Sequence, residues 1–158
     1  MYGRILLASD GTRDSLVALR EGALLARACQ AQVFLLIIDA ETPGTRVADG
    51  VYPRSKGEEP QVLLAFGLTR LARLGLRAAG EVVAGEPAAE IGACAQRFGA
   101  DLVVVGHRRQ SLLERWWSGA ASAYIVDHVK CSVLIARCLI SDAAFEARLE
   151  RETEGPVR

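Results

Sequence analysis

The chain has 158 residues, a length that fits one domain with its own buried core. Apolar residues make up 51% of it, which argues against disorder, and 19 basic side chains balance 19 acidic ones. A net charge of zero gives no general attraction to nucleic acid or to an anionic membrane. The opening Met1–Leu7 lacks a basic leader and a cleavage site, and no apolar run has the roughly 20 residues of a membrane span. We therefore expect a cytoplasmic protein with neither nucleic acid nor membrane as partner.

Five short and mostly apolar runs predict strands that are covered on both faces. In chain order they are Ile5–Ser9, Val33–Asp39, Gly80–Ala84, Leu102–Gly106 and Ser132–Ala136. Helical patterns separate them, at Arg13–Cys29, Pro60–Ala79, Pro87–Phe98 and Ala120–His128. Strict alternation of strands and helices predicts an α/β fold with a five-stranded parallel sheet, helices on both faces and right-handed crossovers.

Two segments lie outside this alternation. Residues 40–57 are rich in Gly, Pro and charge and predict a long loop, either a lid or a disordered connection. The domain is expected to span residues 1–138, and residues 139–158 to form a partly helical extension. Within the extension, Asp142–Glu152 interleaves apolar and charged residues. It is either a solvated tail or a helix that binds a partner.

The turn after the first strand, Ser9–Ser15, has a composition that suits a ligand. Gly11 permits a tight turn, and the helix that begins near Thr12 presents free N–H groups. Alternatively, Asp10 and Thr12 only cap that helix. The residue types alone leave both readings open.

The segment after the fourth strand is the second candidate. Gly106 leaves the strand, and Gly119 opens a helix of small residues that includes Ser122. Arg108, Arg109 and Arg115 add positive charge. Backbone amides near such glycines bind phosphate, although a solvated basic loop has the same composition. Open parallel sheets bind ligands beyond the carboxyl ends of their strands, so we expect this segment and the first turn to converge into one cationic cradle.

The tryptophans, cysteines and histidines do not predict a further site. Trp116 and Trp117 pack against another surface or close over the site, or at least one of them belongs to the core. The cysteines are Cys29, Cys94, Cys131 and Cys138, and they show no metal-binding spacing. We expect free thiols of a reducing compartment and no metal site. We assign neither His107 nor His128 to catalysis.

Four motifs in this order resemble the universal stress protein family, over residues 3–137. They are Ile5–Thr12, Gly85-Glu86-Pro87, Ala100–Gly106 and Asp127–Ile135. The resemblance implies a Rossmann-like sheet of the adenine nucleotide alpha hydrolase-like type, a role in stress response and a homodimer. In this family the last strand, here Ser132–Arg137, commonly pairs with its counterpart in a second subunit.

Family members that bind ATP carry G-x2-G-x9-G-[ST] after the fourth strand. Gly106 and Gly119 keep the spacing, whereas Arg109 and Ala120 replace the second glycine and the hydroxyl residue. An arginine enters positive φ only with strain, but its guanidinium can itself bind phosphate, and Ser122 can supply a hydroxyl. The implied ligand is ATP, ADP, AMP or another anion.

The resemblance also implies residue roles for such a ligand. Asp10 would lie near the base and ribose, and the backbone of Ile37 beside the adenine. The phosphates would lie near Gly106, Arg109, Gly119 and Ser122.

Two classes of function remain. The first is a non-enzymatic, dimeric binding or sensing module. The second is an enzyme, either a slow ATPase or a nucleotidyl transferase of the ATP-pyrophosphatase type. Ser9–Ser15 is similar to the S-G-G-x-D-S loop of the latter enzymes, except that Asp10 replaces a glycine and would direct negative charge toward the pyrophosphate.

Overall fold

The fold is built on one sheet of five parallel strands. A computed structural model of the protein describes residues 1–9, 11, 13–39, 59–107, 128–137, 140–141 and 143–147. The strands are β1 (Arg4–Ser9), β2 (Gln32–Asp39), β3 (Ala78–Ala84), β4 (Leu102–His107) and β5 (Ser132–Arg137). They lie in the order β3-β2-β1-β4-β5, and every neighbouring pair is parallel. The predicted α/β class and its Rossmann-like sheet are confirmed.

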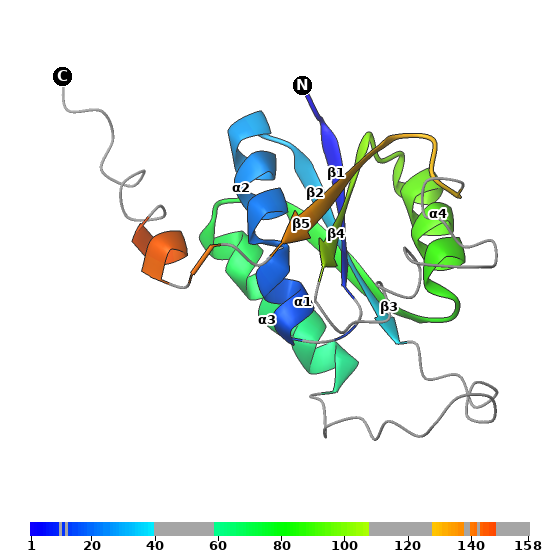
Figure 1. The fold of residues 1–158 in the computed structure, drawn as a ribbon, viewed down its shortest axis with the longest axis horizontal. Helices are drawn as coiled ribbons and strands as arrows, with labels where there is room; N and C mark the ends of the chain where they lie inside the picture. The colour runs from blue at the N-terminus through cyan, green and yellow to red at the C-terminus, as the bar shows by residue number, and fades with distance from the viewer. Residues whose placement is uncertain are drawn as a thin grey trace.

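Four labelled helices cover this sheet. They are α1 (Arg13–Ala18), α2 (Arg20–Cys29), α3 (Pro60–Arg73) and α4 (Pro87–Phe98). In Figure 1, α1, α2 and α3 lie on one face of the sheet and α4 lies on the other. This division follows from the strand order, because right-handed crossovers from β1 to β2 to β3 run in one direction and the crossover from β3 to β4 runs back. The sheet therefore reverses its direction of growth between β1 and β4.

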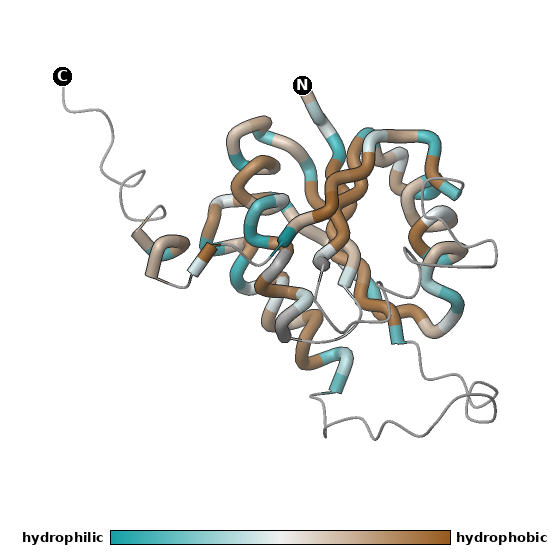
Figure 2. Tube along the Cα trace, in the orientation of Figure 1, coloured by the Kyte–Doolittle hydropathy of each residue, from teal (hydrophilic) through white to brown (hydrophobic). Residues whose placement is uncertain are grey.

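The core consists of two apolar layers, one on each face of the sheet. Successive strand residues point to opposite faces, so Leu7 joins the layer under α1, α2 and α3, whereas Leu6 joins the layer under α4. Both side chains are at most 1% exposed. Figure 2 shows the most hydrophobic residues concentrated along the strands. No helix among the described residues is both long and apolar enough to cross a bilayer.

Two of the predicted helices have different boundaries in the structure. The helix expected at 13–29 is interrupted at Leu19, although the N–H of Leu19 still donates to the carbonyl of Ser15 at 3.2 Å. The helix expected at 60–79 ends at Arg73, and that prediction was wrong at its C-terminal end. Gly75 there adopts φ +73°, a left-handed conformation that terminates helices.

The start of α4 explains one of the motifs as a structural feature. The carboxylate of Glu86 accepts a hydrogen bond from the N–H of Ala89 at 2.8 Å, and Pro87 occupies the first turn. The helix ends at Gly99, whose φ is +67°. The Gly85-Glu86-Pro87 motif thus caps a helix. Of the helix predicted at 120–128 only His128 lies within the described residues, where it is helical.

Candidate ligand site at the carboxyl edge of the sheet

The candidate site lies where β1 and β4 end side by side. Ala8 of β1 pairs with Val105 of β4, so the next residues, Ser9 and Gly106, leave the sheet at neighbouring points. This is also the point at which the strand order reverses. Open parallel sheets bind ligands in the crevice outside such a point, since the connections on its two sides diverge to opposite faces.

Small residues occupy the ends of the central strands at this edge. Ser9 is 1% exposed, and Gly106 is buried. Gly106 pairs with Ala136 of β5, which is also fully buried. These residues are packed inside the domain, and their small side chains take up little volume at the ends of β1, β4 and β5.

Gly11 forms the turn that leaves β1. Its φ is +75°, which favours glycine, and its N–H donates to the Oγ of Ser9 at 3.3 Å. A Cβ added at Gly11 would lie 3.5 Å from the carbonyl oxygen of Ile38 and 3.8 Å from Cγ2 of Ile37. The turn therefore lies within van der Waals distance of the end of β2, and the hydroxyl of Ser9 holds it there.

The end of β2 forms the other wall of this edge. Ile37 pairs with Ser9 on one side and with Val82 on the other, and its side chain is fully buried. Asp39, the last residue of β2, is half-buried. Any contact of Ile37 with a ligand must be made by its backbone, because its side chain belongs to the core.

Of the predicted site residues, the structure brings Gly11 against Ile37 at the end of β2, and it places Gly106 at the end of β4 on the other side of β1. The other predicted site residues lie outside the described part of the chain: Asp10, Thr12, Arg108, Arg109, Gly119 and Ser122. Residues 40–57, Trp116, Trp117 and Cys138 also lie outside it.

Sequence reasoning missed the role of Ser9, whose buried hydroxyl orders the turn. The available signal was a serine two residues before a glycine at a strand exit, which is a common way to stabilise a turn.

The described thiols are buried or half-buried and carry no sign of reactivity. Cys29, Cys94 and Cys131 are free. Burial raises the pKa of Cys94 from 9.0 to about 11, and the nearby charge of Glu81 adds to this rise. Burial also raises the pKa of Cys131, with a further contribution from Asp101. Among the described residues, no three His, Cys, Asp or Glu side chains cluster as metal ligands would.

The strand order, with its reversal between β1 and β4, defines the class of doubly wound α/β proteins. Within that class, the sequence model of the universal stress protein family matches residues 1–137. The chain belongs to the universal stress protein family.

Individual relatives agree with this assignment. Universal stress protein Sll1388 of Synechocystis is 28% identical to the chain, over 86% of this chain and 98% of the relative. The structure of a universal stress protein in complex with cAMP has a TM-score of 0.61 at 22% identity, covering 87% of this chain and 98% of that one. The universal stress protein from Archaeoglobus fulgidus in complex with dAMP has a TM-score of 0.59 at 20% identity, covering 85% and 98%. At these identities the two structures show the shared fold.

Proposed function

We propose that this universal stress protein binds an adenine nucleotide at the carboxyl edge between β1 and β4. The observation that carries the proposal is the pairing of Ala8 with Val105, after which Ser9 and Gly106 leave the sheet at neighbouring points where the strand order reverses. The small side chains at this edge also suit a site that binds a ligand through backbone groups. Two proteins of the same fold were solved with cAMP and dAMP, and both of these ligands are adenine nucleotides.

The proposed roles follow the positions of the residues along the chain. Asp10 and Thr12, on either side of Gly11, contact the ribose and base, and the backbone at Ile37 lies beside the adenine. Arg108 and Arg109 follow Gly106 by two and three residues in the sequence. In this proposal they bind the phosphates. Gly119 and Ser122 complete the phosphate contacts. In this arrangement a guanidinium of Arg109 replaces the backbone contact that a glycine would make.

Isothermal titration calorimetry tests this proposal. The protein is titrated with ATP, ADP, AMP and cAMP, each with and without magnesium. We expect a saturable heat for at least one nucleotide and its loss in Gly106→Asp, since a carboxylate at the edge repels phosphate. Absence of heat with every nucleotide would refute the proposal. Circular dichroism of the variant serves as the control for folding.

We propose further that binding, rather than turnover, is the activity. Among the described residues of the edge, Ser9 Oγ accepts the N–H of Gly11, so this hydroxyl holds the turn. Incubation with ATP tests this point. We expect phosphate release no faster than in Gly106→Asp, and steady release above that control would favour the slow ATPase.

We also propose a homodimer through β5. β5 is an edge strand, and its Val133, Leu134 and Ile135 are only half-buried, whereas Ile5–Ser9 of β1 are fully buried. An apolar edge strand invites pairing with a second copy. Sedimentation velocity at micromolar concentration should show a dimer, and Ile135→Lys should shift it toward monomer. A wild-type monomer at that concentration would contradict the proposal.

We propose a cytoplasmic location. Cys29, Cys94 and Cys131 are free thiols, as is usual in a reducing compartment. Fractionation of cells, with the protein followed by antibody, tests this location. Recovery outside the cytoplasm would contradict it.

A further inference from the structure

Residues 140–147 follow β5 and lie beyond the part of the chain that the family model matches, which ends at residue 137. In Figure 1 their short helical turn lies against the side of the domain formed by α2 and α3. We call the described residues 140, 141 and 143–147 the C-terminal latch. Its contacts are specific enough to define a docking site.

Phe145 anchors the latch in an apolar groove between α1/α2 and α3. Its side chain is 3% exposed and belongs to the core layer on this face of the sheet. The groove reaches down to the strands, and its apolar walls include Leu7, Leu16, Leu35, Phe66 and Leu71. A cavity of about 50 Å³ remains there. Burial of a phenylalanine is the largest favourable contribution a segment this short can offer.

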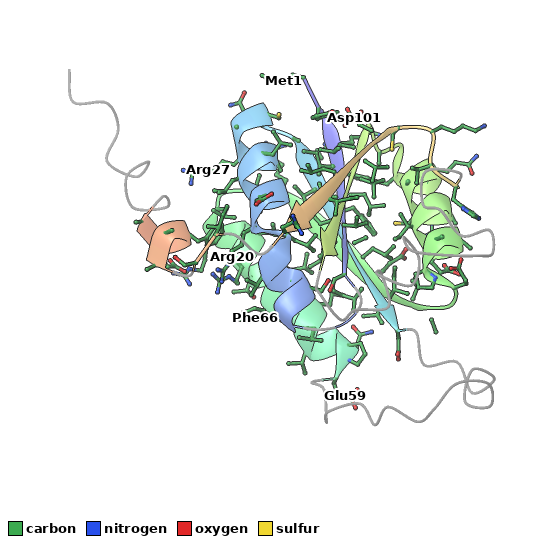
Figure 3. All side chains as sticks on the ribbon, in the orientation of Figure 1. Met1, Arg20, Arg27, Glu59, Phe66 and Asp101 are labelled. Atoms are coloured by element: carbon green, nitrogen blue, oxygen red, sulfur yellow. The ribbon has the colours of Figure 1, made fainter. Side chains whose placement is uncertain are left out.

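Two arginines of the domain pack against the ring of Phe145. The guanidinium carbons of Arg20 and Arg70 lie 5.3 Å and 5.5 Å from the ring centroid, within the range of cation–π contacts. Arg20 is only 6% exposed, and its Nη1 donates to the carbonyl of Ile140 at 2.8 Å. Figure 3 shows Arg20 and Phe66 on the side of the helical layer that faces the latch. The groove thus recognises an aromatic ring and the backbone that precedes it.

The residue after the aromatic ring carries a complementary charge. Oε1 of Glu146 lies 3.3 Å from Nη2 of Arg70, and Oε2 lies 3.9 Å from Nη2 of Arg73. These groups are partly exposed, so the pairing contributes orientation more than affinity. The groove therefore fits an aromatic residue followed directly by an acidic one.

The latch depends on the groove for its helical form. Ser141 Oγ accepts the N–H of Ala144 at 3.2 Å, and the carbonyl of Ser141 accepts the N–H of Phe145 at 2.9 Å. A helical turn of this length is unstable alone in water. Docking of Phe145 must supply the free energy that orders it.

We propose that the groove between α1/α2 and α3 is a docking site for a short aromatic–acidic helical segment, and that the chain's own residues 140–147 occupy it in cis. Only two residues separate Arg137 of β5 from Ile140. The three Cα–Cα steps between them span at most about 11 Å. This short connection holds the segment at the groove of its own subunit.

A peptide supplied in trans tests the docking site. The probe is a fluorescein-labelled synthetic peptide with the sequence of residues 140–150. We expect it to bind full-length Phe145→Ala, whose groove lacks its anchor, and to bind the wild-type chain at least tenfold more weakly. The same peptide with alanine at position 145 should not bind either chain. Absence of binding to Phe145→Ala, or equal binding to both chains, would overturn the proposal.

A second measurement does not depend on the folding of the Phe145 variant. Hydrogen exchange of the Phe145 amide reports latch opening in the full-length chain. Glu146→Arg should accelerate this exchange about fivefold, as expected for loss of a partly exposed ion pair, and Arg70→Glu in the same chain should restore part of the protection, because it re-forms the ion pair but removes the cation–π contact with Phe145. Protection unchanged by Glu146→Arg would refute the role of the charge. Protection that rises with protein concentration would refute docking in cis and indicate exchange between two copies.

Discussion

The carboxyl edge and the latch groove are assembled from opposite kinds of residues. The edge is formed by small residues and backbone, as at Gly11 and Gly106, so a ligand there would meet peptide groups. The groove is formed by large side chains that enclose Phe145. The edge is therefore sensitive to backbone conformation, and the groove to side-chain volume. Substitutions that alter only one of these properties should separate the two regions.

The largest effect on stability is expected in the groove. Phe145→Ala should lower the free energy of unfolding by about 3 kcal/mol, the low end for a buried phenylalanine, because the short latch can undock instead of leaving a cavity. Phe145→Leu, which keeps most of the volume, should lose about 1 kcal/mol. Urea denaturation measures both. Equal stability of the alanine variant and the wild-type chain would mean that the latch does not dock.

The buried thiol of Cys94, on the α4 face, provides a reference for both regions. Because its pKa is raised to about 11, its thiolate fraction at pH 8 should be about 100-fold below that of an ordinary cysteine. Ellman's reagent should therefore modify Cys94 far more slowly in the folded chain than in urea. Phe145→Ala and Gly11→Ala should raise this rate by no more than their loss of unfolding free energy predicts, and a larger rise in either variant would show that the damage is not local.

The same thiol predicts a dependence of stability on pH. The unfolded chain loses this proton near its ordinary pKa of 9.0, whereas the folded chain retains it until about 11. The free energy of unfolding should therefore be constant with respect to this group below about pH 9 and fall as the pH rises from 9 to 11. Comparison of Cys94→Ala with the wild-type chain isolates the contribution. A wild-type profile that matches the alanine variant across this window would contradict it.

Two glycines with the same backbone conformation separate stability from binding. Gly11 and Gly75 have φ of +75° and +73°, and an added Cβ would have no close contact at either position. Each change to alanine should therefore cost about 1 kcal/mol of stability through backbone strain alone. Only Gly11→Ala should also weaken nucleotide binding in calorimetry. Equal affinity in both variants would remove the turn after β1 from the site.

The smallest effects are expected from two hydroxyls that each accept one backbone N–H. Ser9 accepts the N–H of Gly11 at the edge, and Ser141 accepts the N–H of Ala144 in the latch. Ser141→Ala should cost about 0.5 kcal/mol in urea denaturation, because Ser141 is exposed and water can replace part of the lost bond, whereas Ser9→Ala should cost about 1 kcal/mol, because Ser9 is buried. Ser9→Ala should weaken nucleotide binding, whereas Ser141→Ala should accelerate exchange of the Phe145 amide. Weaker nucleotide binding in Ser141→Ala, or faster exchange of the Phe145 amide in Ser9→Ala, would contradict the comparison.

Most of the fold could be predicted from the sequence, because apolar runs, Pro at helix starts and Gly99 all act locally. The end of α3 could not. The segment from Leu74 to Ala79 has good helix formers, but pairing of Ala78 with Val33 of β2 competes with them and prevails. The left-handed Gly75 was the local signal that should have outweighed the pattern.

The carboxyl edge and the latch groove also differ in how far the sequence predicts them. The adjacency of the ends of β1 and β4, at Ser9 and Gly106, follows from strand order alone, so topology predicts it. The docking of Phe145 depends on Arg20 and Arg70, which lie far away in the sequence. A pattern of alternating apolar and charged residues in the tail left a solvated extension and a partner-binding helix open. The structure shows that the tail's Phe145 packs on the chain's own domain.

The central claim is that a nucleotide binds at the end of β1 beside β4, and amide shift mapping tests it most directly. Titration of 15N-labelled protein with ATP should shift the amide signals of Gly11 and Gly106 in a saturable manner. The amides of Gly75 and Phe145 should remain in place. Saturable shifts confined to residues away from the carboxyl edge, or no shifts at all, would contradict the account.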